Sequence, residues 1–203
     1  MTKRALSVLA ILMLFCASAS AQQIKATFGI TGGGIATQMM TEPAPISPFS
    51  FNGYGGAFTT IEFKNKIGLH AGANYIMTGS VYEMSGVYMN AQQQYIQVPV
   101  TLQLSPKSWF TLEGGFYQNI LFGSSFQEMG SENVTISPDT GALEYNFGVL
   151  GGLQFNFGRV VFLNMRYHYG LTNCYVIQGK GYPQGLITAG LGLNIISTRK
   201  SAF

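Results

Sequence analysis

Residues 161–172 read VFLNMRYHYGLT, and this stretch decides the fold because its side chains alternate in character. Apolar side chains occupy the odd-numbered positions from Val161 to Leu171. The polar side chains between them are Asn164, Arg166, His168 and Thr172. Neighbouring residues of a β-strand face opposite sides, whereas a helix repeats every 3.6 residues. The stretch therefore predicts a strand with one apolar and one polar face.

The same period of two recurs along the chain. For example, Ile96, Val98, Val100, Leu102 and Leu104 interleave with Gln97, Thr101 and Gln103. Segments of this kind cover roughly residues 24–38, 51–64, 66–78, 94–105, 109–122, 143–157, 160–172 and 184–196. No linker, composition break or low-complexity run separates them. We therefore expect a single all-β domain of eight strands.

The links between these segments alternate in length. The short links are about Asn65 alone, Ser105-Pro106-Lys107-Ser108 and Gly158-Arg159. The long, polar links cover roughly residues 39–50, 79–93, 123–142 and 173–183. Outer-membrane barrels have short periplasmic turns and longer extracellular loops, which is the same alternation. With an even strand number, both ends of the domain lie on the side of the short turns.

The composition favours a membrane location for these strands. Only 9% of the residues are charged, whereas soluble domains carry about 25%. No segment after residue 21 offers the run of roughly 18 apolar residues that a membrane helix needs. We therefore expect an eight-stranded antiparallel up-and-down transmembrane β-barrel in the outer membrane of a Gram-negative cell.

Residues 1–21 have the layout of a secretory signal peptide. Lys3 and Arg4 precede an apolar run over residues 5–17, and Ala19-Ser20-Ala21 offers small residues for cleavage. We expect export and a mature barrel of residues 22–203. Lipidation of Cys16 is the alternative, but Phe15 is large where a small residue is needed.

Removal of the signal peptide also changes the charge balance. Of the 11 basic residues, Lys3 and Arg4 are lost, which leaves 9 against 8 acidic residues. This balance gives no reason to expect nucleic acid as a partner. Cys174 becomes the only cysteine, so no intramolecular disulfide is expected.

Aromatic residues bracket the apolar face of two segments. Phe51 and Phe63 flank small and aliphatic residues, and residues 145–157 have aromatic side chains at both ends. Outer-membrane barrels carry such girdles at both interfaces. The other face is mostly Thr, Asn, Gln and Gly, which suits an interior better than a solvated coat. We expect the apolar face to meet lipid. The alternative is a soluble periplasmic lipocalin-like barrel with its apolar face turned inward around a ligand.

Two short motifs resemble the PorT-like outer-membrane β-barrels, within the wider group of OmpA/OmpX-like eight-stranded barrels. Tyr95-Ile96-Gln97-Val98-Pro99-Val100 is similar to the start of one family strand, with Gln97 where an acid is common. Arg166-Tyr167 followed by Gly170-Leu171-Thr172-Asn173 resembles the penultimate strand and its exit. The likeness covers most of residues 22–196. It implies an eight-stranded outer-membrane barrel, and some relatives are linked to a secretion apparatus.

Ionisable residues on the polar face are the candidate site. They are Glu62, His70, Glu113, Arg166 and His168, and Glu144 is a further charge on the same face. A proton-transfer or gating cluster is one interpretation, because ionisable groups inside membranes are often functional. A plug, in which Arg166 pairs with carboxylates, is the other and the favoured one. Side chains can fill the interior of an eight-stranded barrel, so we expect no permanent open pore.

The sequence offers little that points to catalysis. Two histidines without a clear third ligand make a poor metal site, and we expect no cofactor. Ser124, Ser125 and Asp139 share a long link with no histidine, so a hydrolytic site is not expected.

Glycine and proline residues occur inside two of the predicted strands. Gly32-Gly33-Gly34 lacks the Lys-Ser/Thr of a phosphate loop, so it is interpreted as a bend, a bulge or a place of close aromatic packing. Pro99 lies inside a predicted strand and predicts a bulge or an unpaired amide near the rim.

Specific function is expected in the long links, because the barrel body offers only lipid-facing and packed surfaces. We expect a structural or partner-binding protein that contacts outer-membrane lipid and other envelope or secretion proteins. An enzyme that modifies lipid or peptide is the remaining alternative. Link 123–142 carries Glu128, Glu132 and Asp139 and no base, which suits solvated charge or a cationic partner.

Overall fold

The computed structural model describes residues 24–40, 50–63, 66–84, 87–128, 135–136, 145–177 and 180–200. The predicted signal peptide, Glu144 and Asp139 lie outside these residues. The strands are β1 (Ile24–Met39), β2 (Ser50–Phe63), β3 (Ile67–Met84), β4 (Val87–Lys107), β5 (Phe110–Glu128), β6 (Thr135–Ile136), β7 (Tyr145–Phe157), β8 (Val161–Gly170), β9 (Tyr175–Ile177), β10 (Lys180–Tyr182) and β11 (Gln184–Lys200). Across the described residues, no helix has the length and apolar character needed to cross a bilayer.

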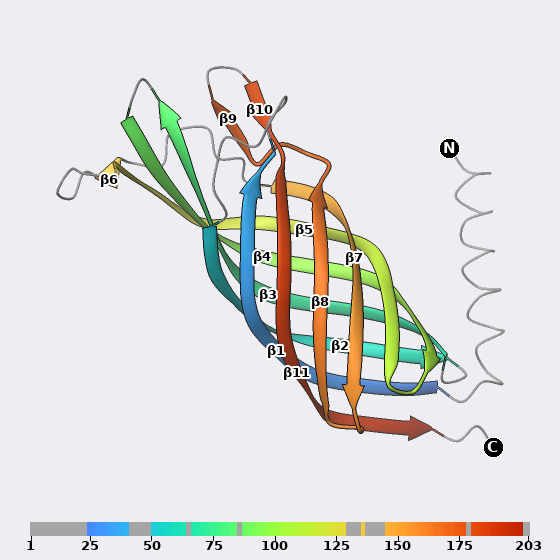
Figure 1. The fold of residues 1–203 in the computed structure, drawn as a ribbon. Helices are drawn as coiled ribbons and strands as arrows, with labels where there is room; N and C mark the ends of the chain where they lie inside the picture. Colours follow the sequence, from blue (N-terminus) through green and yellow to red (C-terminus); the bar gives the residue numbers. More distant parts are fainter. Residues whose placement is uncertain are drawn as a thin grey trace, which may run out of the picture.

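Eight of these strands close into an antiparallel barrel (Figure 1). Their order is β4-β3-β2-β1-β11-β8-β7-β5, and the pairing of β4 with β5 closes the ring. The short β6 pairs with the outer part of β5, and β9 and β10 form a separate hairpin. The predicted fold class and the predicted strand order are confirmed.

The barrel has two different ends. At the turn end lie the short connections and the barrel termini, where Ile24 pairs with both Phe63 and Lys200. The turns differ from the prediction by a few residues. Residues 64–66 join β2 to β3, Ser108-Trp109 join β4 to β5, and residues 158–160 join β7 to β8. Gly158 has a φ of 75°, a conformation that favours glycine. The opposite end carries the long connections and is called the loop end.

Two predicted long links, 79–93 and 123–142, contain strands where the sequence predicts loop. The stretch 79–93 was expected as a loop, but β3 continues to Met84 and β4 begins at Val87, with these two residues paired. The partner strand β5 continues to Glu128, opposite Met89. We call residues 79–84, 87–93, 123–128 and 135–136 the projecting sheet (Figure 1). Apolar and polar residues alternate along a strand only where its two faces meet different environments. A strand that extends beyond the bilayer can therefore lose this sequence pattern although its backbone stays paired.

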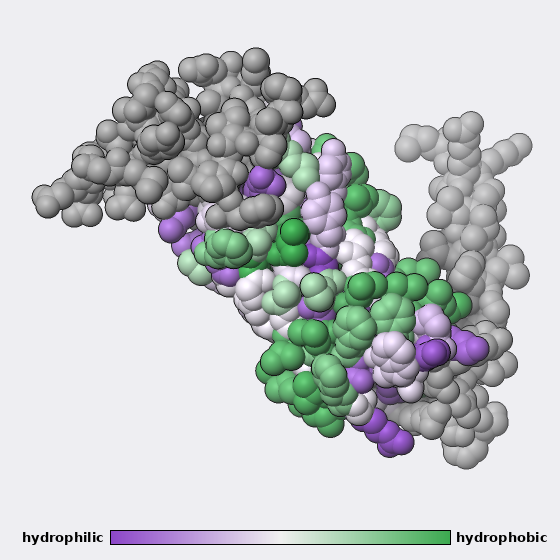
Figure 2. All heavy atoms as spheres, viewed as in Figure 1, coloured by the Kyte–Doolittle hydropathy of each residue, from purple (hydrophilic) through white to green (hydrophobic). Residues whose placement is uncertain are grey.

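The apolar face of each barrel strand points outward. Leu102 is 62% exposed, whereas its neighbours Thr101 and Gln103 are 1% and 6% exposed. Hydrophobic residues cover much of the visible barrel wall in Figure 2. A soluble lipocalin-like barrel would have the opposite arrangement, so the structure contradicts that alternative.

Pro99 marks no bulge and does not lie near the rim, which corrects that part of the prediction. The β3–β4 ladder is nevertheless interrupted opposite Pro99, between the pairs Ala71–Val100 and Asn74–Gln97. Pro99 lies in the middle of β4, and the β3–β4 register is the same on both sides of the interruption. The register shifts lie elsewhere, between Phe28 and Gly29 and between Gln94 and Tyr95 among other places. Proline lacks a backbone N–H donor, so it removes one hydrogen bond of the ladder. The neighbouring pairs on both sides of the strand keep the register unchanged.

Candidate functional site

A buried ion pair lies in the middle of the lumen. The Arg166 guanidinium on β8 donates from Nε to Glu113 Oε1 at 2.5 Å and from Nη2 to Oε2 at 3.1 Å. Both side chains are almost fully buried, at 3% and 0% exposed. Thr101 and Gln103 of β4 each lie 3.4 Å from Glu113 Oε2. Because a buried charge is costly without partners, this network neutralises and saturates the carboxylate.

His70 belongs to the same cluster. Arg166 Nη2 lies 3.3 Å from His70 Nε2, and Thr60 Oγ1 lies 3.0 Å from His70 Nδ1. A guanidinium can only donate, so Nε2 is the acceptor and the ring proton sits on Nδ1. His70 therefore serves as a neutral bridge between Arg166 and Thr60. We call Glu113, Arg166 and His70 the plug.

Two aromatic rings complete the middle of the lumen. Phe58 stacks on His70 with ring centroids 5.2 Å apart and meets Phe162 edge-on at 5.5 Å. A side chain at Gly29 would collide with Phe58, and one at Gly192 would collide with Phe162. These two glycines therefore make room for the rings. Close packing of an aromatic ring is one of the three roles predicted for Gly32-Gly33-Gly34, and here Gly29 and Gly192 have that role.

Toward the loop end the lumen stays filled. Tyr54 donates to Asn164 at 2.8 Å, and Asn164 donates to Thr31 at 3.0 Å. An apolar cluster follows, formed by Ile35, Tyr54, Ile76, Tyr95 and Leu186. Buried polar side chains such as Asn74, Gln93 and Asn119 surround this cluster, so side chains fill the lumen between the plug and the loop end.

His168 and Gln97 form a second contact away from the plug. Gln97 Nε2 lies 3.5 Å from His168 Nδ1, and His168 Nε2 lies 3.4 Å from Thr188 Oγ1. The contact is between two neutral groups, so His168 does not join the charged cluster.

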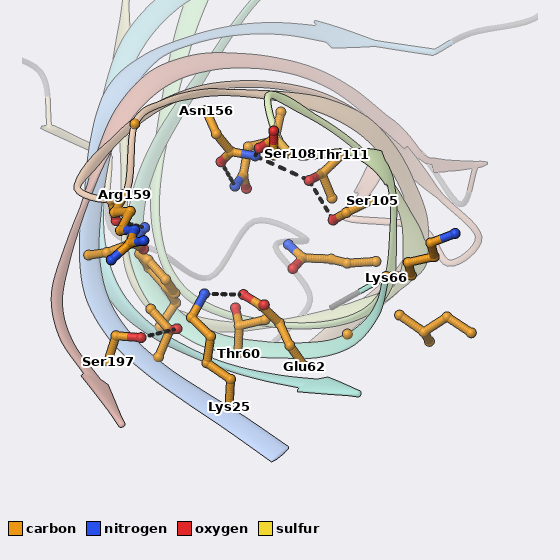
Figure 3. Close-up of a pocket in the computed structure, with 18 residues that line it drawn as sticks. Lys25, Thr60, Glu62, Lys66, Ser105, Ser108, Thr111, Asn156, Arg159 and Ser197 are labelled. Atoms are coloured by element: carbon orange, nitrogen blue, oxygen red, sulfur yellow. Dashed lines mark hydrogen bonds and ion pairs between the residues drawn. The ribbon is translucent and has the colours of Figure 1, made fainter. Parts of the chain in front are cut away.

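The turn end of the lumen is hollow, contrary to the expectation of a tightly filled interior. A cavity of about 500 Å³ lies there, which we call the vestibule. Its wall is mostly polar and combines short side chains such as Ser105 and Thr111 with longer ones, and Figure 3 shows Lys25 and Glu62 reaching into it from one side. Lys25 Nζ lies 2.9 Å from Glu62 Oε1, in a pair that is about one-third exposed. Glu62 is therefore separate from the plug.

The vestibule wall has more cations than carboxylates. Arg159 lines it as well, Lys66 lies at its edge with its side chain pointing away from the hollow (Figure 3), and Glu62 is the only acid among the lining residues that the structure describes. Hydroxyl and amide groups bond to one another around it, such as Ser105 to Thr111 at 2.8 Å and Gln154 to Asn156 at 2.7 Å. The alternation of residues along each strand predicts that such side chains face inward. It predicts neither that Glu62 pairs with Lys25 nor that a cavity is present.

Within the described residues, no group of three His, Cys, Asp or Glu side chains could hold a metal ion. Ser124 and Ser125 lie on the outer part of β5, remote in sequence and strand position from both histidines. The structure thus brings together three of the predicted ionisable residues, Glu113, Arg166 and His70, and places Glu62 and His168 in separate contacts.

These features define a membrane β-barrel with an apolar exterior, a central plug and a polar hollow at one end. The outer membrane protein beta-barrel domain family matches residues 19–176. The chain therefore belongs to the outer membrane protein beta-barrel domain family, and it is an integral outer-membrane protein. Because outer-membrane barrels have short periplasmic turns and longer extracellular loops, we expect the turn end on the periplasmic side and the loop end outside the cell.

Two solved structures share this fold. The attachment invasion locus protein Ail of Yersinia pestis has a TM-score of 0.51 and 15% identity over 84% of this chain and 98% of its own. Neisserial surface protein A has a TM-score of 0.55 and 12% identity, covering 84% of this chain and 99% of its own. No curated protein sequence matches the chain.

Proposed function

We propose that this barrel is a non-catalytic anchor whose projecting sheet binds a partner protein of the cell envelope. The observation that carries this proposal is the unequal length of the strands. The strand β4 has 21 residues, β5 has 19 and β3 has 18, whereas β8 has 10. About 9–11 residues suffice for a strand to cross the bilayer. The excess length on three neighbouring strands extends a sheet into the extracellular space.

The lumen supports a non-catalytic role. Glu113 is bonded to Arg166, Thr101 and Gln103, and His70 is held between Arg166 and Thr60. A general acid or base needs a free position for a substrate proton. The plug groups instead bond to each other and are buried on all sides. The PorT-like motifs suggest a component of secretion as the class of partner.

In-cell crosslinking tests this proposal. A photoreactive residue replaces Ser125, which is exposed on the projecting sheet, and the matched control replaces Leu102 on the lipid face. We expect a discrete protein adduct from position 125 and none from position 102. Both variants should keep the heat-dependent shift in gel mobility of a folded barrel.

Two results would contradict the proposal. The first is the absence of any protein adduct from position 125 in intact cells. The second is an activity on lipid or peptide that is lost in a His70→Gln variant, because that would make the barrel an enzyme.

A further inference from the structure

The proposed partner-binding sheet leaves the opposite end of the barrel without a role. The vestibule opens at the turn end, and its inner limit is formed by Phe58, Thr60 and Gln103 beneath the plug. The plug and the apolar cluster fill the lumen beyond it. Any occupant of the vestibule therefore enters and leaves on the periplasmic side.

The charged side chains of the vestibule indicate the charge of the molecule that it binds. Lys25 and Arg159 line the vestibule, against the carboxylate of Glu62 among the described lining residues, while the Lys66 side chain at its edge points away from the hollow (Figure 3). Glu113, just above, is already neutralised by Arg166. The lining therefore carries an excess of positive charge inside a low-dielectric wall, which attracts anions.

The remaining wall groups suit an oxyanion with a hydroxylated body. Thr27, Thr60, Ser105, Ser108, Thr111 and Ser197 supply hydroxyls, and Gln103, Gln154, Asn156 and Asn194 supply amides. Figure 3 shows Asn156, Thr111 and Ser105 on the side of the hollow opposite Lys25. The volume of about 500 Å³ lies within the range of small-molecule sites and far exceeds one phosphate group.

We propose that the vestibule binds a phosphate group carried on a small hydroxylated body, of the phosphoglycerol type. Lys25 and Arg159 bind the phosphate oxygens, because lysine acts as a point charge and arginine as a two-pronged donor toward phosphate. The hydroxyl and amide groups of the wall bond to the hydroxylated body. Glu62 competes with the phosphate for Lys25, since the two side chains are paired at 2.9 Å.

The ligand chemistry is common to two sources, a free phosphate ester in the periplasm and the headgroup of a phospholipid in the inner leaflet. For the first source, the full mature chain is folded in zwitterionic micelles at low ionic strength and titrated with glycerol 3-phosphate by calorimetry. Glycerol serves as the uncharged comparison. For the second source, native mass spectrometry counts phosphatidylglycerol retained from mixed micelles with phosphatidylcholine.

Matched variants separate this site from general surface charge. Lys25→Gln and Arg159→Gln should each weaken glycerol 3-phosphate binding about tenfold, as expected for loss of a charge-assisted hydrogen bond. Glu62→Gln should strengthen binding because it releases Lys25. Lys107→Gln removes the same charge at the same end, but Lys107 lies over Trp109 outside the vestibule, so binding should stay unchanged.

The outcomes distinguish the sources and can overturn the proposal. Binding of glycerol 3-phosphate with the expected order of variants identifies a free ester. Retention of phosphatidylglycerol that is lost in the Lys25→Gln/Arg159→Gln variant, without binding of the free ester, identifies the lipid headgroup. Equal binding and equal retention by the wild type, this double variant and Lys107→Gln overturn the proposal, provided that all three show the heat-dependent gel shift of a folded barrel.

Discussion

The middle and the periplasmic end of the same lumen are built differently. In the middle, Phe58 and Phe162 pack against each other beside the buried Glu113–Arg166 pair. At the periplasmic end, short side chains such as Ser105 and Thr111 line a cavity of about 500 Å³. The backbone barrel is continuous through both regions. The size of the inward side chains therefore decides whether an eight-stranded barrel is closed or hollow.

The two ion pairs differ in the same way. Arg166 and Glu113 are buried among protein groups, whereas Lys25 and Glu62 are each about one-third exposed. Breaking a buried pair leaves an uncompensated charge, but an exposed pair is screened by water and salt. The comparison therefore predicts a large structural contribution from the plug and a small one from the vestibule.

The largest expected effect tests the plug. Arg166→Met leaves Glu113 buried without a cation and should lower the free energy of unfolding by about 3–5 kcal/mol. The double variant Glu113→Gln/Arg166→Met should recover most of this loss, because it removes both charges. Urea-induced unfolding in lipid vesicles measures both values. A single variant as stable as the wild type would show that the plug does not hold the lumen together.

An intermediate effect is expected from the aromatic packing. Gly192→Ala places a methyl group against the Phe162 ring, so Phe162 or the backbone must shift. Overpacking of this kind costs about 1–3 kcal/mol. The matched control is Gly34→Ala, whose added methyl group would meet only the carbonyl of Asn52, at 3.9 Å. Equal stability of the two variants in the same urea titration would argue against tight packing in the middle of the lumen.

The smallest effect is expected at the vestibule. Lys25→Gln removes one member of a partly exposed pair and should change the free energy of unfolding by less than about 1 kcal/mol. The change should shrink further as salt is added, because salt screens exposed charges. If Lys25→Gln lowered the free energy of unfolding as much as Arg166→Met, the predicted difference between the plug and the vestibule would be wrong.

The fold could be predicted because each barrel strand separates lipid from lumen. Residues 161–172 alternate for that reason, and Tyr167 is exposed while His168 is buried, as parity requires. The alternation of short and long links likewise follows from having one end on each side of the membrane. The projecting sheet was missed because residues 79–93 lie outside the bilayer, where the sequence has no need to alternate.

The site could be predicted only in part. Parity places Arg166, Glu113 and His70 in the lumen, but their contacts depend on the register between strands, which the sequence does not display. Glu62 and Glu113 both lie at lumen-facing positions of their strands, yet Glu62 pairs with Lys25 and Glu113 pairs with Arg166. The hollow depends on the summed volume of side chains from many strands, so no single segment reveals it.

The central claim is that the outward apolar side chains meet lipid, and spin labelling tests it most directly. Labels are attached to cysteines at Val100, Leu102 and Asn156 in a Cys174→Ser background, with the protein in lipid vesicles. Relaxation by oxygen, which concentrates in lipid, and by a water-soluble nickel chelate is then compared. The account predicts strong oxygen and weak nickel relaxation at 100 and 102, and the reverse at 156 in the vestibule. Nickel relaxation at 100 and 102 as strong as at 156 would contradict it.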